Sequence, residues 1–224
     1  GGGHVAAHPS PQTPIRPPVS RRALQRFFPE SLQGMDAAAR AESAKVSQFS
    51  GNALGWEQEV EIFNSEGLQV ADRRHYNRIM AQTIAMEGSE QSVGYEAPGA
   101  LMGWEHAERI DPRELALTAT RQALVKLGAA PCPSGTLPVI MESGFGGVIF
   151  HEACGHLLET TSVAKKASVF HDKMGQLIAN PAVSAVDEGL QSNAWGSINV
   201  DDEGMATQHT QLIKDGVLTG FLVD

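Results

Sequence analysis

The chain is organised around the stretch Gly144-Phe145-Gly146-Gly147-Val148-Ile149-Phe150-His151-Glu152-Ala153-Cys154-Gly155-His156-Leu157-Leu158-Glu159. A glycine cluster and an apolar run lead into two histidines, and a glutamate follows the first of them. Neutral imidazole is a common zinc ligand, and a carboxylate beside a ligand can take a proton from an attacking water. The stretch therefore predicts a metal site with a general base.

The spacing of the two histidines is unusual. His151 and His156 are five residues apart, whereas the familiar zinc-peptidase helix has the pattern H-E-x-x-H, with its histidines four apart. Five steps along a regular α-helix rotate by about 140°, which would splay the rings. A local i→i+5 turn would bring them together, and Gly155, which has no Cβ, makes such a distortion inexpensive. We therefore expect a helix with a π-type turn or break near Gly155. The alternative at this point is that the three side chains are ordinary hydrogen-bonded polar groups at a helix start.

The rest of the chain alternates helix-like and strand-like segments. The first half predicts short helices over Ser20–Phe28, stopped by Pro29, and over Asp36–Lys45, capped by Asp36; an antiparallel meander of strands over Gln58–Phe63, Leu68–Arg73, Asn77–Glu87 and Gln91–Glu96; a loop over Ala97–Ile110; and a helix over Asp111–Leu127. The second half predicts a buried strand over Thr136–Met141, a strand over Ala182–Asp187, and a hairpin of Thr207–Lys214 with Val217–Val223 around Asp215-Gly216.

These segments indicate an α+β fold. We expect an antiparallel sheet with flanking helices, followed by the start of a second, mixed β-rich domain that contains the histidine helix. The expected boundaries are an extended arm or linker over residues 1–19, part of an N-terminal α/β domain over 20–134, and the truncated start of a C-terminal domain over 135–224. The chain has no initiator methionine, so we expect its start to be cut or processed; it ends at Asp224 within an apparent strand, so we expect it to be a fragment.

Composition excludes several classes of function. The net charge is −9, from 17 basic and 26 acidic residues, and no run of Lys or Arg exceeds two. A direct nucleic-acid surface is therefore not expected. We find neither an apolar run of membrane length nor a signal peptide, and two cysteines make no disulfide framework. The predicted location is cytoplasmic, without membrane association.

Other motifs are read as structural. Cys154 is expected to pack inside the helix, and Cys132 lies between two prolines of a linker. The acidic run Asp201-Asp202-Glu203 favours a tight turn over a calcium or magnesium loop. The glycine cluster lacks the Gly-Lys-Ser/Thr ending of a phosphate loop, and the chain has no Gly-x-Ser-x-Gly elbow for a serine nucleophile.

An ordered set of motifs resembles the TldD/PmbA metallopeptidase family, specifically its TldD-like members with an H-E-x-x-x-H motif. The set comprises Asn64-Ser65-Glu66-Gly67-Leu68, Asp72-Arg73-Arg74, Leu137-Pro138-Val139-Ile140, Gly146-Gly147-Val148, His151-Glu152-Ala153-Cys154-Gly155-His156, Val186-Asp187-Glu188-Gly189, Asn199-Val200-Asp201-Asp202-Glu203-Gly204 and Leu212-Ile213-Lys214-Asp215-Gly216-Val217-Leu218. The resemblance covers most of the chain after Ala37.

The resemblance implies a zinc-dependent peptidase that hydrolyses peptides or unfolded segments. His151 and His156 would bind one zinc ion per active site, and Glu152 would activate a water on the metal. The third ligand would be a cysteine downstream of Asp224. Apart from the resemblance, Glu159 follows His156 by three residues, so it is a candidate either for orienting a ligand imidazole or for a solvated carboxylate at the helix end. Without such a cysteine, the remaining candidates for the third ligand are His171, His209, Glu159 and Asp187.

The resemblance also implies an assembly, either a homodimer or a heterodimer with a PmbA/TldE-type paralogue. An extended substrate could add as a strand beside an exposed sheet edge. The alternative function is a non-catalytic interaction or assembly module of such a complex, in which case this fragment alone would be inactive. The family has also been named a modulator of DNA gyrase. The composition of this chain gives no support to direct DNA binding.

Overall fold

The computed structural model describes residues 21–223. The arm predicted for residues 1–19 and the Ser20 start of the first predicted helix lie outside the described residues. The chain divides into two units. Unit 1 contains the residues up to Cys132 together with Gln191–Ala206, and unit 2 contains Pro133–Leu190 together with the residues from Thr207 onward. The polypeptide therefore crosses between the units three times.

Unit 1 is built on an antiparallel meander. Strands β1 (Val46–Phe63), β2 (Gln69–Glu87) and β3 (Glu90–Glu96) lie in the order β1-β2-β3, and the short β4 (Gly99–Ala100) also pairs with β2. The predicted meander is confirmed, but the two strands expected on either side of residues 74–76 are one continuous strand. The ladder of β2 with β1 continues through these residues, so there is no break in pairing.

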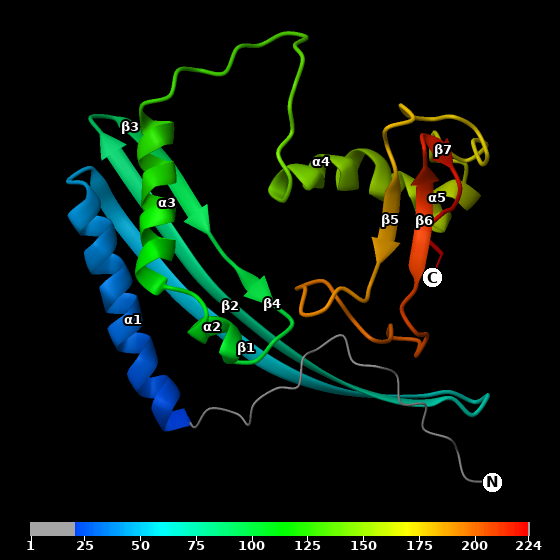
Figure 1. Ribbon diagram of the computed structural model, residues 1–224, viewed down its shortest axis with the longest axis horizontal. Helices are drawn as coiled ribbons and strands as arrows, with labels where there is room; N and C mark the ends of the chain where they lie inside the picture. The colour runs from blue at the N-terminus through cyan, green and yellow to red at the C-terminus, as the bar shows by residue number, and fades with distance from the viewer. Residues whose placement is uncertain (1–20, 224) are drawn as a thin grey trace. The chain divides into compact units, whose positions relative to one another are not determined.

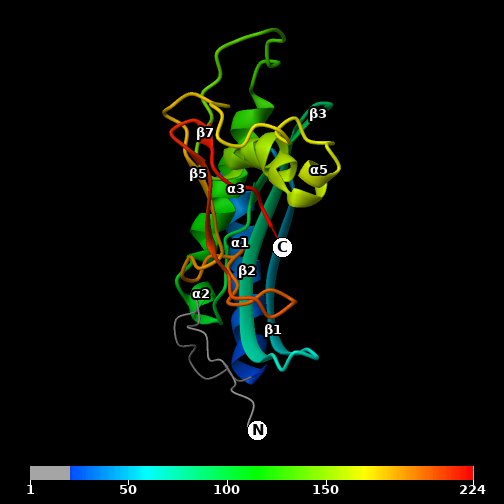
Figure 2. The same cartoon turned by 90° about the vertical axis from the view of Figure 1, so that its right-hand side faces the viewer.

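Two helices cover one face of the sheet. They are α1 (Arg21–Glu42) and α3 (Pro112–Leu127), which lie along the same side of the strands (Figure 1; Figure 2). Successive strand residues point to opposite faces, so alternate residues of β2 pack against these helices. The resulting core contains Met35, Ile79, Ala81, Ala107, Ala116 and Ala119.

Helix α1 differs from the prediction. Two helices separated at Pro29 were expected, but Pro29 lies inside a single helix. A proline in a helix removes one backbone hydrogen bond and clashes with the preceding turn. Leu32 and Met35, which follow Pro29, pack into the core of unit 1 and favour a continuous helix. Asp36 does not cap a helix; its Oδ1 lies 2.8 Å from Nε of Arg40, one turn later.

Helix α3 begins as its sequence predicts. The Asp111 side chain accepts hydrogen bonds from the backbone N–H groups of Arg113 and Glu114, and Pro112 takes the first helical position. Its apolar face is buried, and the hydroxyls of Thr120 and Thr83 meet across the core at 2.9 Å. The segment predicted as a loop before α3 contains β4 and the short helix α2 (Glu105–Glu108).

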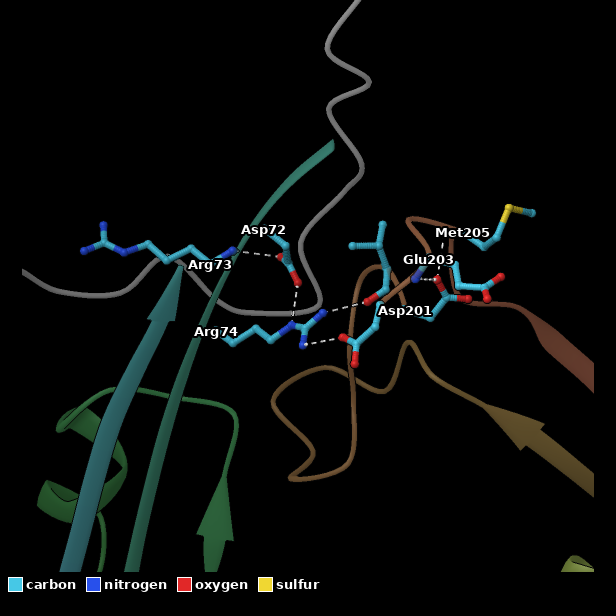
Figure 3. Close-up of polar contacts among 8 residues, drawn as sticks. Asp72, Arg73, Arg74, Asp201, Glu203 and Met205 are labelled. Atoms are coloured by element: carbon cyan, nitrogen blue, oxygen red, sulfur yellow. Dashed lines mark hydrogen bonds and ion pairs between the residues drawn. The ribbon is translucent and has the colours of Figure 1, made fainter. Parts of the chain in front are cut away.

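The opposite face of the β1–β2 hairpin binds Gln191–Ala206. Arg74 donates from Nη2 to the backbone oxygen of Val200 at 2.8 Å, and its Nε lies 2.9 Å from Oδ2 of Asp72 (Figure 3). Asn199 donates to the other oxygen of Asp72 at 3.2 Å. The side chains of Asp72 and Arg74 are only 6% and 8% exposed, so this is a buried ion pair that fixes the segment.

An aromatic cluster fixes the same segment at a second point. Trp195 makes edge contacts with Trp56 and Tyr76, whose rings stack at 4.6 Å. The guanidinium of Arg78 lies 4.7 Å from the centre of the Trp195 ring. A Cβ added at Gly99 would come within 2.6 Å of the Trp195 ring, so only glycine allows this close approach.

The acidic run in this segment forms a tight turn. Oδ1 of Asp201 accepts the backbone N–H groups of Glu203 and Met205, both at 2.9 Å (Figure 3). Gly204 follows with a φ of +85°, a conformation that glycine adopts at little cost. The predicted tight turn is confirmed.

Unit 2 contains a small antiparallel sheet. Strands β5 (Ala185–Glu188), β6 (His209–Lys214) and β7 (Val217–Leu218) pair in that order. Asp215 and Gly216 connect β6 to β7 with φ values of +49° and +80°, as a two-residue hairpin turn requires. The predicted hairpin is confirmed, although β7 is shorter than expected. The unit's core contains Leu158, Leu212, Ile213 and Leu218.

The buried strand predicted over Thr136–Met141 is wrong. The structure assigns no strand there, and Val139 and Ile140 are 77% and 99% exposed. Among residues 21–223, no strand pairs with this segment, so its backbone lacks the ladder that would make it a strand. No helix in the same described range is both long enough and apolar enough to cross a membrane.

Candidate metal centre

The two histidines lie on a helix whose geometry changes at the first of them. A 3₁₀ turn over Phe145–Gly147 leads into α4 (Val148–Phe150), followed by a π-helical segment over His151–Gly155 and a second 3₁₀ turn over His156–Leu158. The predicted π-type turn is confirmed. Its i→i+5 hydrogen bond joins the histidines themselves, because the backbone N–H of His156 donates to the carbonyl of His151.

This hydrogen bond puts the two imidazoles side by side. Their ring centres are 4.5 Å apart and their planes are inclined at 73°. A ligand atom from each of His151, Glu152 and His156 lies within 4.8 Å of the others. In a regular α-helix the two histidines would be rotated by about 140° from each other. The π segment therefore brings together the three side chains that the sequence singles out.

Gly155 fits the π segment, but the geometry of that segment does not require a glycine there. Its φ is −53°, which every residue type adopts. A Cβ added there would meet Nδ1 of His151 at 3.7 Å, an ordinary contact. The π segment therefore does not require glycine at position 155 on steric grounds, although the sequence suggested that glycine would favour it.

Glu159 fixes the ring of His156. Its Oε1 lies 2.7 Å from Nδ1 of His156. The hydrogen bond to Glu159, together with its charge, raises the pKa of His156 above the ordinary value of 6.5. A carboxylate on Nδ1 favours the tautomer with its proton there, which leaves Nε2 as the free lone pair.

Cys154 packs away from the group. It is half-buried against the cluster around Leu158, and burial raises the pKa of its thiol. A thiol must lose its proton to bind zinc, and this environment opposes that loss. The expectation that Cys154 has a packing role is confirmed.

The other candidate ligands have different partners. Nδ1 of His171 lies 3.0 Å from the backbone oxygen of Ser168, and Nδ1 of His209 lies 3.5 Å from Oε1 of Glu188. Within residues 21–223, the grouped ligand atoms come from three side chains, and His171, His209, Glu159 and Asp187 are not among them. No further His, Cys, Asp or Glu side chain of this range joins the group, so a third protein ligand besides the two histidines is not identified there.

The donor set suits zinc. Imidazole nitrogens bind zinc at about 2.0–2.1 Å, so two of them on a tetrahedral ion lie about 3.3 Å apart. The ligand atoms of the group already lie within 4.8 Å of one another. Two imidazoles are ligands typical of catalytic zinc, and the neighbouring carboxylate of Glu152 can act as a base.

Two family models match the chain. The description "PmbA/TldA metallopeptidase central domain" matches residues 22–127, and "PmbA/TldA metallopeptidase C-terminal domain" matches residues 134–224. The chain belongs to the TldD/PmbA metallopeptidase family. The histidine motif falls inside the second match.

Relatives in this family are named as metalloproteases. A TldD homologue from Haemophilus influenzae is 34% identical over 200 residues, which cover 87% of this chain and 42% of that protein. A metalloprotease from Methanocaldococcus jannaschii is 36% identical over 139 residues, which cover 62% of this chain and 30% of that protein. The chain thus spans less than half the length of these relatives.

Solved structures have the same fold. A protein from Thermotoga maritima, named as a proposed modulator of a DNA gyrase, superposes with a TM-score of 0.75 at 22% identity, covering 99% of this chain and 50% of that one. TldE from Thermococcus kodakarensis superposes with a TM-score of 0.69 at 19% identity, covering 98% of this chain and 50% of that one. At these identities the likeness concerns the fold alone.

Proposed function

We propose that this chain contains the metal-binding helix of a zinc-dependent peptidase that acts on peptides or unfolded polypeptide segments. The observation that carries the proposal is the π segment, which groups His151, Glu152 and His156. An assembly role alone requires no such distortion of a helix. The family membership, whose relatives are named metalloproteases, agrees with this function.

Each residue of the group has a separate role. His151 and His156 would hold the metal, and Glu159 would orient His156 through their 2.7 Å contact. A zinc ion bound by these residues would supply Lewis-acid chemistry, favouring attack of a water on the scissile carbonyl. Glu152 accepts the proton of the attacking water and passes it to the leaving amine.

The remaining parts of the active site are proposed from the resemblance. The third ligand is a cysteine from a segment downstream of Asp224, and one zinc ion serves each active site. The partner is a second copy or a PmbA/TldE-type paralogue, and the fold likeness to TldE is compatible with that. The cytoplasmic location and the domain boundary near residue 134 stay predictions.

The substitution Glu152→Gln tests the role of the base. We expect cleavage of an unstructured peptide to fall by about 10²–10⁴-fold, because the amide cannot accept a proton. The zinc content should stay at the parent level. The matched control is Glu142→Gln, because Glu142 is an exposed glutamate outside the group and should leave both quantities unchanged.

Two results would change the assignment. Parent-level cleavage by Glu152→Gln would contradict the role of Glu152 as base. If Glu152→Gln lost both its zinc and its cleavage activity, Glu152 would be a ligand instead, since its carboxylate lies within the same 4.8 Å group.

The alternative function is a non-catalytic assembly module. The openness of the group favours it, since His151, Glu152 and His156 are all exposed, whereas catalytic sites usually exclude water. Zinc content distinguishes the two functions. An assembly module would neither retain zinc through dialysis nor cleave peptide, and a peptidase would do both.

A further inference from the structure

The outer edge of β1 is a long unpaired strand edge. β1 contains 18 residues and lies at the end of its sheet, so among residues 21–223 no strand pairs with its outer side. Strands in globular proteins usually have 3–10 residues. Figure 1 shows the far part of the β1–β2 hairpin running past the helices that cover the rest of the sheet. A bare edge of this length is a template for pairing with another chain.

The features that normally block such pairing are missing from this edge. The part of β1 from Asn52 to Phe63 contains no lysine, arginine or proline, and its side chains are exposed or half-exposed on both faces. Leu54 and Trp56, which share one face, are 43% and 40% exposed. Natural edges are commonly protected by lysine or proline, or by being short.

Repulsion between glutamates disfavours two ways of pairing such edges. The charged residues of β1 are Glu57, Glu59 and Glu61, all on the face opposite Trp56. A parallel, in-register pair would align each glutamate with its copy. An antiparallel pair centred anywhere from Glu57 to Glu61 would place glutamates opposite one another. Like charges directly opposite are destabilising.

An antiparallel pair centred on Gly55 avoids these repulsions. Each glutamate then faces an uncharged residue of the other copy: Glu57 faces Ala53, Glu59 faces Gly51 and Glu61 faces Phe49. The same register places Trp56 opposite Leu54 twice, once on each side of the two-fold axis. An aromatic side chain opposite an aliphatic one is a stabilising cross-strand pair. Leu54 and Trp56, two of the three large apolar side chains of β1 that are exposed, thus contact each other across the axis; the third, Phe63, lies at the end of the strand.

We propose that the outer edge of β1 pairs antiparallel with β1 of a second copy of this chain, across a two-fold axis at Gly55. The interface is isologous, which means that both copies use the same surface: Trp56 of one copy contacts Leu54 of the other, and the reverse contact is also made. It joins the sheets of unit 1 into one continuous sheet. The pairing does not depend on the proposed peptidase activity, because β1 contains no residue of the metal group.

Charge pairs at positions 52 and 58 test both the interface and its register. Asn52 and Gln58 are exposed and face each other in this register. The double variant N52E/Q58E puts two like-charge pairs across the axis, and N52K/Q58E puts two opposite-charge pairs there. By analytical ultracentrifugation we expect the parent to dimerise. The first variant should dimerise about tenfold more weakly than the second.

Cysteine cross-linking gives an independent readout. In a Cys132→Ser background, an Asn52→Cys chain mixed with a Gln58→Cys chain should form a disulfide-linked dimer, and an Asn52→Cys chain alone should not. A parent that stays monomeric at about 100 µM would overturn the proposal. So would a dimer whose affinity is equal in the two charge variants, because it would use another surface. A monomer whose β1 edge binds an extended peptide would assign the edge to peptide instead.

Discussion

At the scale of single residues, one backbone hydrogen bond brings together the two histidines of the proposed metal site. His156 N–H donates to the carbonyl of His151, and this i→i+5 bond places the two rings 4.5 Å apart. The five-residue spacing predicts that distortion from helix geometry alone. The spacing could not predict how many residues the π segment contains. One i→i+5 hydrogen bond anywhere near Gly155 would bring the two rings to the same side of the helix.

The contact between Glu159 and His156 predicts a pH effect. In metal-free protein, Glu159 raises the pKa of His156 above its ordinary 6.5. The contact therefore stabilises the folded state fully below the ordinary pKa, and the effect is lost as pH rises through the raised pKa. We expect Glu159→Gln to lower the pKa of His156, measured by NMR titration of the imidazole.

The same substitution should weaken metal binding. Replacing the partner of a ligand histidine typically costs 10–100-fold in metal affinity, and competition with a chelator measures it. Glu188→Gln is the matched control, since Glu188 faces His209, which is outside the metal group. Equal zinc affinity in the two variants would show that Glu159 does not support the site.

Two adjacent arginines should differ sharply in their contribution to stability. Arg74 is 8% exposed and paired with the buried Asp72, whereas Arg73 is 59% exposed and paired with Glu57 and Glu59 on the sheet surface. Arg74→Ala leaves a buried carboxylate unpaired and should lower the free energy of unfolding by about 3–5 kcal/mol. Arg73→Ala should cost less than about 1 kcal/mol. Urea unfolding measures both, and similar losses would contradict the buried role of Arg74.

At the scale of elements, the sequence predicts best where the signal is local. The Asp111 cap and the Asp215-Gly216 turn need only their own neighbours, and both are found. The single helix through Pro29 and the unbroken β2 depend on packing partners far along the chain. Arg74 shows the reason most clearly. A charged residue on a strand suggests an exposed face, but its partner Val200 lies 126 residues away.

Two glycines should respond differently to substitution by alanine. Gly216 has a φ of +80°, and a Cβ there would lie 2.4 Å from the backbone oxygen of Ala179. Gly216→Ala should therefore destabilise unit 2 by about 2 kcal/mol or more. Gly155→Ala should change stability by less than about 1 kcal/mol and preserve zinc binding, because its Cβ meets only an ordinary contact. Thermal unfolding compares them, and equal losses would contradict the stated geometry.

At the scale of the whole molecule, sequence predicts the α+β class and an ordered set of family motifs, but not the division into units. The predicted boundary near residue 134 assigns all later residues to one domain, and it stays a prediction. The structure groups Gln191–Ala206 with unit 1. The sequence of that segment does not predict this grouping, because the residues that bind it, the Asp72–Arg74 pair and the Trp56–Tyr76 stack, lie far away in the chain.

The central claim is that His151 and His156 jointly hold a zinc ion. Anomalous diffraction at the zinc absorption edge, from crystals grown with zinc, tests it most directly. We predict one anomalous peak at about 2.0–2.1 Å from a ring nitrogen of each histidine. Crystals of His156→Ala should lack that peak while the fold is retained. A peak elsewhere, or none between the two rings of the parent protein at saturating zinc, would contradict the claim.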